Sequence, residues 1–321
     1  MSSTPGQFPK GRQPGRWARE KTDESGVWYP RWFWPSFTVP GVAWLAIFFL
    51  LPFYAILSVA FGTVDTFRNP LPVWQPWYWS TEHFQAVFEK IFGANAFLRP
   101  AYQRTFIYVF FASAICLVIG YAVAYYVARY AGKRRTLILV LLISPFWISY
   151  LMRMLAWVNL LQEDGYVNKV LKVVGFAPSP IKWLEGKPIT VVLGLVYGYI
   201  PYMILPLYGF LDRINSSLLE AGRDLGASPF STFFRVTLPL SKPAIYAALV
   251  IVSLPMFGDY YTNNMLSGSP RTTMLGNLID DSVGAPGRGP QGAVLVVLLM
   301  ILLIVPMLYY LRSTLRQQEV G

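Results

Sequence analysis

Six apolar segments, each long enough to cross a lipid bilayer, constrain this chain more than any other feature. They lie at roughly 38–62, 104–131, 137–161, 189–211, 242–258 and 293–315. A membrane-spanning helix needs about 20 such residues, and only helices and closed barrels satisfy their backbone hydrogen bonds in lipid. Composition agrees, because 55% of the residues are hydrophobic and only 13% are charged, whereas a soluble domain carries about 25% charged residues. The sequence therefore predicts an all-α integral membrane protein with six spans.

Lysine and arginine predict how these spans are oriented. If the N-terminus lies inside the cell, the inner segments hold most of the basic residues, whereas acidic residues nearly cancel those of the outer loops. This is the positive-inside pattern, so the net charge of +11 indicates topology and requires no nucleic acid partner. We expect residues 1–36 to form a cytoplasmic tail and interfacial elbow, residues 37–315 the six-span domain, and residues 316–321 a second cytoplasmic tail.

One inner loop, residues 212–241, is polar yet locally organised, and we call it the polar loop. Ser217 followed by Glu220 matches a capping box at the start of a short helix. Gly226 suits the position just after the end of that helix, and Pro229 suits the first position of a second helix. The sequence thus predicts a helix-turn-helix on the cytoplasmic side, and the alternative is an ordinary solvated connection.

Charged and aromatic residues in or beside the spans are candidates for a solute pathway. Arginine inside a span costs about 2.5–3.5 kcal/mol to insert, so Arg153 is expected to face a cavity or a partner. Aromatic faces attract organic cations, and carboxylates near a pathway mouth suit amines. The alternatives are outward snorkelling for the arginine, packing for the rings and a solvated loop for the carboxylate. The candidates for the pathway are Trp147, Tyr150, Arg153, Tyr197, Asp259 and Tyr260.

The sequence holds no recognisable catalytic or metal site. It contains no G-x-x-x-x-G-K-[ST] loop to cradle nucleotide phosphates. The single histidine, His83, falls in an outer loop, and the single cysteine, Cys116, falls in an apolar run. Neither a Cys/His metal cluster nor a Ser/His/Asp triad can be assembled from them. We therefore expect a protein that is not an enzyme and that carries no cofactor or metal of its own.

The polar loop resembles the EAA signature of binding-protein-dependent ABC importer permeases, E-A-A-x-x-x-G, nine residues, then I-x-L-P. Here Glu220-Ala221-Gly222 is followed by Gly226 and, after nine residues, by Val236-Thr237-Leu238-Pro239. Gly222 replaces the second alanine and Val236 replaces isoleucine, and both departures are conservative. In that family the loop is a coupling helix that docks on a cytoplasmic ATPase. The resemblance implies ATPase docking by Glu220, Ala221, Gly222, Arg223, Asp224, Leu225, Gly226, Ala227, Ser228 and Pro239.

The resemblance extends over roughly residues 38–315. It is carried by the segments 144–147 with Arg153, 165–168, 193–197, 205–208, 258–260 and 275–279, which are similar to spermidine/putrescine permeases of the PotB type. The basic N-terminal tail and Asn263-Asn264, where many relatives carry proline, depart from that group. The resemblance implies a six-helix type I ABC importer transmembrane domain with a cytoplasmic coupling helix.

The same resemblance implies partners and a location. The partners are a dimer of cytoplasmic ATPase subunits that would hold ATP-Mg, a second permease of the PotC type or a copy of this chain, an external solute-binding protein, and membrane lipid. The location is the bacterial inner membrane, with both termini in the cytoplasm. The implied solute is a polyamine such as spermidine or putrescine.

Two alternatives to this function stay open at the level of sequence. The first is an importer of the same class for an opine, a phosphonate or another anionic or zwitterionic solute. The second is an ion-coupled secondary transporter, which would need carboxylates in the middle of the membrane. The predicted spans contain none, which counts against this second alternative.

Overall fold

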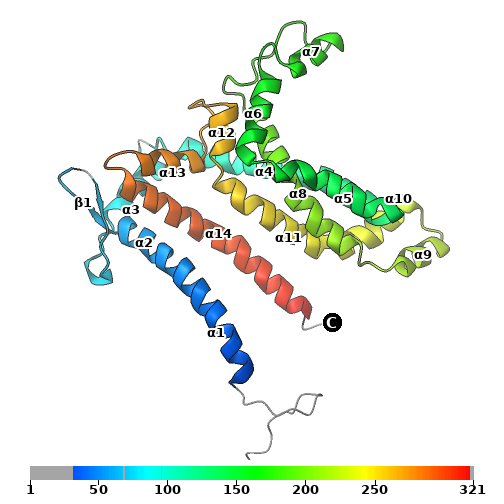
Figure 1. The fold of residues 1–321 in the computed structure, drawn as a ribbon, viewed down its shortest axis with the longest axis horizontal. Coiled ribbons are helices and arrows are strands. Elements are labelled where there is room, and N and C mark those ends of the chain that lie inside the picture. Colours follow the sequence, from blue (N-terminus) through cyan, green and yellow to red (C-terminus); the bar gives the residue numbers. More distant parts are fainter. Residues whose placement is uncertain (1–31, 68, 95, 319–321) are drawn as a thin grey trace, which may run out of the picture. The chain divides into compact units, whose positions relative to one another are not determined.

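The computed structural model describes residues 32–67, 69–94 and 96–318 (Figure 1). The predicted N-terminal tail, most of the interfacial elbow and the last three residues lie outside the described residues. Contacts divide the chain into two units, Met1–Ala55 and Ile56–Gly321. In the first unit, α1 (Phe33–Leu45), a π-helical turn (Ala46–Leu50) and the beginning of α2 (Leu51–Ala60) form an apolar helical stretch. The π-helical turn precedes Pro52, whose ring does not fit against the carbonyl four residues earlier in a regular helix.

The second unit supplies the other long apolar helices. Among the described residues, five helical stretches are long and apolar enough to cross a membrane. They are Pro35–Ala60, Arg99–Arg129, Pro188–Leu211, Pro229–Phe257 and Gly289–Arg312. Within the second unit these correspond to α4 (Arg99–Arg129), α8 (Pro188–Leu211), α10 (Pro229–Thr232) with α11 (Leu238–Phe257), and most of α14 (Gly289–Gln318).

The third predicted span, 137–161, is not one continuous helix. A 3-10 turn (Gly132–Arg134), α5 (Arg135–Ile143) and a second 3-10 turn (Ser144–Trp147) lead to a break, after which α6 (Tyr150–Leu161) continues at 88° to them. The break follows Pro145, and both Ile148 and Ser149 have extended ψ angles, 141° and 139°. Proline removes a helical hydrogen bond and its ring crowds the preceding turn. Counting this bent pair as one span gives the six spans that the sequence predicts.

The fifth span is longer than predicted. Instead of beginning near residue 242, it begins at α10 (Pro229–Thr232), passes through a π-helical turn (Phe233–Thr237) and continues as α11 (Leu238–Phe257). The second short helix of the polar loop is therefore the first turn of this span rather than a separate element. Pro239 has no N–H to donate, and the wider π-helical turn lies directly before it, where such bulges re-route backbone bonds.

Three helices, α4, α8 and α11, form the main core of the second unit, and they lie side by side in Figure 1. Small residues let their backbones approach closely, as is usual between membrane helices. A Cβ at Gly120 of α4, for example, would lie 2.8 Å from Cγ of Met203 on α8. The rest of the buried core is largely aliphatic and includes Cys116, Leu195, Leu207, Ala248 and Met256.

The connections between the spans carry short elements. Two strands of two residues each, β1 (Thr63–Val64) and β2 (Pro70–Leu71), pair in antiparallel register. A 3-10 turn (Pro76–Tyr78) then leads to α3 (Glu82–Phe92). After α6, the chain forms α7 (Tyr166–Val173). After α11, α12 (Tyr261–Leu266) and α13 (Leu275–Gly284) lead to α14. The segment between α8 and α10 holds α9 (Ser216–Asp224).

Candidate functional site

The polar loop folds as a capped helix followed by a sharp turn. The N-cap of α9 is Asn215, whose side-chain oxygen accepts a hydrogen bond from the backbone N–H of Ser217 at 3.1 Å. The predicted capping box of Ser217 with Glu220 is therefore wrong, because the N-cap lies two residues earlier, at Asn215. Asparagine is as good an N-cap as serine. The extended backbone of Asn215 places its side-chain oxygen against the N–H groups of the first turn.

The turn that ends α9 matches the prediction. Gly226 has a φ of +80°, a left-handed conformation that favours glycine. Its N–H donates to the carbonyl of Arg223 at 2.8 Å, and the N–H of Ala227 donates to the carbonyl of Gly222 at 3.1 Å. These two bonds define a Schellman motif. Ser228 then caps α10 by accepting from the N–H of Ser231 at 3.2 Å.

The residues predicted to dock an ATPase lie at the surface of this loop. Eight of the ten are exposed, and Gly222 and Ala227 are half-buried. Of these ten, Leu225 is 88% exposed, and the apolar side chains of Phe230 and Leu218 beside the set are 74% and 50% exposed. Contiguous exposed apolar surface rimmed by charges is typical of a site of protein contact. The structure therefore presents α9 and the turn after it as a projecting contact surface (Figure 1).

Hydrogen bonds fasten the polar loop to the spans. An Nη of Arg129, at the end of α4, donates to the carbonyls of Leu211 and Ile214 at 2.9 and 3.0 Å, and so caps the end of α8. A cation at the C-terminus of a helix can donate hydrogen bonds to the free carbonyls there and interacts favourably with the helix dipole. Arg135, at the start of α5, forms an ion pair with Asp212 at 3.1 Å. The end of α8 is thus bonded to both α4 and α5.

The start of the fifth span is held in a similar way. The hydroxyls of Tyr121 on α4 and Ser241 on α11 are hydrogen-bonded at 2.8 Å. Phe233 packs edge-on against Tyr121 and Tyr125, with ring centroids 5.7 and 5.3 Å apart. The polar loop and the start of the fifth span are thus bonded to or packed against α4, α5 and α8.

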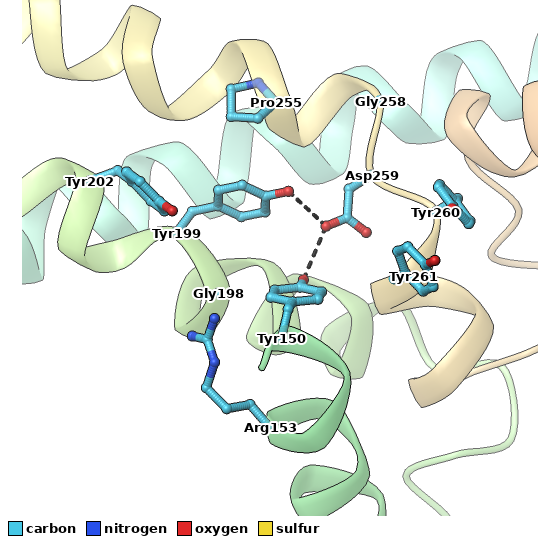
Figure 2. Close-up of a pocket in the computed structure, with 10 residues that line it drawn as sticks. All are labelled: Tyr150, Arg153, Gly198, Tyr199, Tyr202, Pro255, Gly258, Asp259, Tyr260 and Tyr261. Carbon is cyan, nitrogen blue, oxygen red and sulfur yellow. Dashed lines mark hydrogen bonds between the residues drawn. The ribbon is translucent and has the colours of Figure 1, made fainter. Parts of the chain in front are cut away.

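A cavity of about 310 Å³ lies beside the middle of α8 and the C-terminal end of α11, with α6 and the segment that leads into α12 forming its other walls (Figure 2). Its walls are Tyr150, Arg153, Gly198, Tyr199, Tyr202, Pro255, Gly258, Asp259, Tyr260 and Tyr261. Five of these ten residues are tyrosines, which combine an aromatic face with a hydroxyl that can donate or accept a hydrogen bond.

Asp259 is the carboxylate of this cavity, and it is 7% exposed. Its Oδ2 accepts hydrogen bonds from the hydroxyls of Tyr150 at 3.0 Å and Tyr199 at 2.9 Å, and its Oδ1 accepts from the N–H of Thr262 at 2.9 Å. Among the described residues, no Lys, Arg or His lies within ion-pair distance of it. All three partners are neutral, so the negative charge of a deprotonated Asp259 is solvated by dipoles but not balanced.

Arg153 lines the same cavity on the other side of Tyr150 (Figure 2). Its guanidinium carbon lies 4.3 Å from the ring centroid of Phe146 and 5.3 Å from that of Tyr150. The cavity therefore holds one acidic and one basic side chain, separated by an aromatic ring.

Electrostatics favour neutral tyrosines at the mouth of the cavity. A hydrogen bond with Tyr261 raises the pKa of Tyr260 to about 12, so this phenol stays protonated at physiological pH. The two rings stack with centroids 4.2 Å apart. The mouth thus presents aromatic faces and hydroxyls rather than a phenolate.

The structure brings together four of the six predicted pathway residues, namely Tyr150, Arg153, Asp259 and Tyr260. Tyr197 does not line the cavity; its ring centroid lies 5.9 Å from the guanidinium of Arg153 on the side of Phe146. Trp147 is 78% exposed and forms no part of the cavity wall.

Sequence reasoning missed Tyr199 and Tyr202, which form one wall. They are three residues apart on α8, and such residues share a helix face, but this spacing does not show that the shared face meets Asp259. Among the described residues, no group of three or more His, Cys, Asp or Glu could hold a metal ion.

Comparison with known proteins places this geometry in context. Residues 117–316 match the model of a family described as binding-protein-dependent transport system inner membrane component. The chain is 32% identical to the spermidine/putrescine transport system permease protein PotB of Haemophilus influenzae over 84% of its length and 90% of that protein. It is also 32% identical to the PotB protein of Escherichia coli K12, over 85% of its length and 94% of that protein.

A solved structure shares the fold. It is a bacterial alginate ABC transporter in complex with an alginate pentasaccharide-bound periplasmic protein, matched with a TM-score of 0.67 over 87% of this chain and 92% of that one. Sequence identity to it is 17%, so this likeness concerns the fold alone.

Proposed function

We propose, from the premise that this chain belongs to the family of binding-protein-dependent transport system inner membrane components, that it forms half of the pathway of a polyamine importer. Two relatives, each about a third identical over most of both chains, are named as spermidine/putrescine permeases. In this proposal the chain itself is a transport subunit and the work of ATP hydrolysis belongs to a partner.

The observation that carries the choice of solute is the carboxylate of Asp259 in a cavity walled by tyrosines. A protonated amine would supply a positive charge close to Asp259. It would donate hydrogen bonds to the carboxylate in place of one or both tyrosine hydroxyls. Charge-assisted hydrogen bonds of this kind are about twice as strong as neutral ones. The tyrosine faces would stabilise the methylene chain and the ammonium group of the same solute.

The partners follow from the family and from the polar loop. A cytoplasmic dimer of ATPase subunits would bind α9 through the exposed residues of 220–228. A second permease of the PotC type or a copy of this chain would form the other half of the pathway. An external binding protein would deliver the solute to the outer loops. ATP binding would favour one arrangement of the paired subunits, which is a difference in affinity between two states. The bonds from Arg129, Arg135 and Tyr121 would carry that movement from the loop into the spans.

The test is uptake of radiolabelled putrescine and spermidine into proteoliposomes that contain the complete transporter and its binding protein. We expect uptake that requires ATP, and we expect Asp259→Asn to reduce it at least about tenfold, because a hydrogen bond to a charged group contributes roughly 1.5–3 kcal/mol. The matched control is Asp281→Asn, an exposed carboxylate outside the cavity. Full activity of Asp259→Asn would remove this residue from the pathway, and uptake without ATP would contradict the importer.

A further inference from the structure

The guanidinium of Arg153 lies against three aromatic rings. Its central carbon is 4.3 Å from the ring centroid of Phe146, 5.3 Å from that of Tyr150 and 5.9 Å from that of Tyr197. All three distances fall within the range of about 6 Å over which a ring face attracts a cation. Phe146 and Tyr197 lie 5.9 Å apart, and Trp157 packs edge-on against Tyr197 at 5.3 Å. We call Phe146, Tyr150 and Tyr197 the aromatic cage.

Arg153 is an incompletely satisfied occupant of this cage. Its Nε and Nη1 atoms are buried and have no hydrogen-bond partner among the described residues. None of the ion pairs between described residues includes it. Buried guanidinium groups normally have most of their donors bonded. Ring contacts therefore hold the guanidinium of Arg153 in the cage. Because Nε and Nη1 form no hydrogen bonds there, moving the guanidinium out of the cage breaks none at these two atoms.

The cage and the cavity share a wall. The hydroxyl of Tyr150 donates to Asp259 at 3.0 Å, while the ring of Tyr150 belongs to the cage that surrounds Arg153. Figure 2 shows Asp259 and the guanidinium of Arg153 on different sides of this ring. An amine bound at Asp259 consequently lies one aromatic side chain away from the cage.

We propose that Arg153 is a tethered cation that occupies a receptor site for a second ammonium group of the solute. The inference rests on the proposed function and concerns how the same cavity treats a diamine. With Arg153 in the cage, only Asp259 can receive an amine, and the diamine is held at one end. When Arg153 leaves the cage, both ends are held.

A tethered cation solves a problem that any pathway for a polycation has. Conduction requires sites that bind well enough for the solute to enter and weakly enough for it to leave. A cavity with a carboxylate and an empty aromatic cage would bind a diamine at both ends and release it slowly. Competition from Arg153 keeps the affinity low without removing the groups that recognise amines.

The first experiment measures binding of radiolabelled putrescine by equilibrium dialysis. It uses the complete transporter in nanodiscs, without the external binding protein. We expect Arg153→Gln to raise the affinity at least about fivefold, which corresponds to freeing one desolvated cation–π site. Arg153→Lys keeps a tethered cation and is expected to show a smaller gain in affinity than Arg153→Gln. Arg134→Gln makes the same change of charge at an exposed residue of the turn before α5, and it is expected to have no effect.

A double-mutant cycle separates the cage from a simple loss of charge. Phe146→Leu alone provides the reference affinity for the cycle, because it removes one ring of the cage while Arg153 is still present. Combined with Arg153→Gln, the same change is expected to abolish the gain. Trp147→Leu, at a neighbouring ring that is 78% exposed, is the matched control in both backgrounds. If the gain survives in the double variant, loss of charge explains it and the cage is refuted; if Arg153→Gln gains nothing, the tethered cation is refuted.

Uptake kinetics provide a readout that a structural role of Arg153 would not produce. We expect Arg153→Gln to lower both the KM and the maximal rate of putrescine uptake, because tighter binding slows release. A lower maximal rate with a raised KM would contradict the proposal. If the wild type imports no polyamine while the dialysis pattern holds, the proposed solute fails and the tethered cation stands.

Discussion

At the scale of single residues, the cavity depends on how closely Tyr150 approaches α8. Gly198 lies directly behind that ring, and a Cβ added there would be 2.9 Å from Cε2 and 3.0 Å from the hydroxyl oxygen of Tyr150. The glycine therefore sets the distance at which the Tyr150 hydroxyl reaches Asp259. In the proposed function, a residue with no side chain thus helps to position a group that binds the solute.

Gly198→Ala tests this dependence. The added methyl group would push Tyr150 away from Asp259, so we expect lower uptake and a loss of stability of about 1–3 kcal/mol from overpacking. Uptake assays and thermal unfolding of the purified protein measure the two effects. Gly209→Ala, on the same helix and with no atom within 4 Å of its added Cβ, should change neither. Wild-type uptake by Gly198→Ala would show that Tyr150 can move without consequence.

At the scale of elements, the sequence predicts those features that depend on local chemistry. The turn at Gly226 could be predicted because only a residue that tolerates a φ of +80° ends a helix in this way. The N-cap could not be assigned from pattern alone, because Asn215 and Ser217 are both good caps and only the entry angle of the chain after α8 decides between them.

The break in the third span and the length of the fifth show a second limit. Pro145 indicates a disturbance, but the 88° bend between α5 and α6 depends on tertiary packing that a hydropathy pattern does not contain. The sequence predicts a second short helix at Pro229 but not that this helix continues into the fifth span, where Phe233 packs against Tyr121 of α4. The cavity was predictable in part, since Asp259 and Arg153 are conspicuous charges, whereas the role of Tyr199 depends on the register of α8.

The turn after α9 carries a prediction at this scale. We expect association with the ATPase to weaken in the order Gly226, Gly226→Asn, Gly226→Ala, Gly226→Val. Asparagine tolerates the left-handed conformation, whereas other residues pay roughly 1–2 kcal/mol for it. Co-purification of the ATPase with permease variants, and their coupled ATPase activity, measure the order. An alanine variant that binds the ATPase as well as wild type would mean that α9 is not the contact.

At the scale of the whole molecule, the proposed orientation places the polar loop in the cytoplasm and α7 outside. The chain has a single cysteine, Cys116, and it is buried, so surface cysteines can be introduced and labelled selectively. Leu225 is 88% exposed on the polar loop, and Phe176, just after α7, is 81% exposed. These two positions report on opposite faces of the membrane.

Labelling with a membrane-impermeant maleimide tests the orientation. We expect Leu225→Cys to react in inside-out vesicles and to be protected in right-side-out vesicles. Phe176→Cys is expected to show the reverse, and the wild type should not react in either. The opposite pattern would put α9 on the outer side, beyond the reach of a cytoplasmic ATPase.

The uninterrupted helical stretch from Pro229 to Phe257 has one further consequence. Its first turn directly follows the loop that we propose binds the ATPase, and its last residues lead into the wall of the cavity that we propose binds the solute. The stretch is 29 residues long, so its two ends lie about 44 Å apart at a rise of about 1.5 Å per residue. Substitutions at the cavity end can therefore change which solute is taken up, while the residues at the other end keep their contact with the same ATPase.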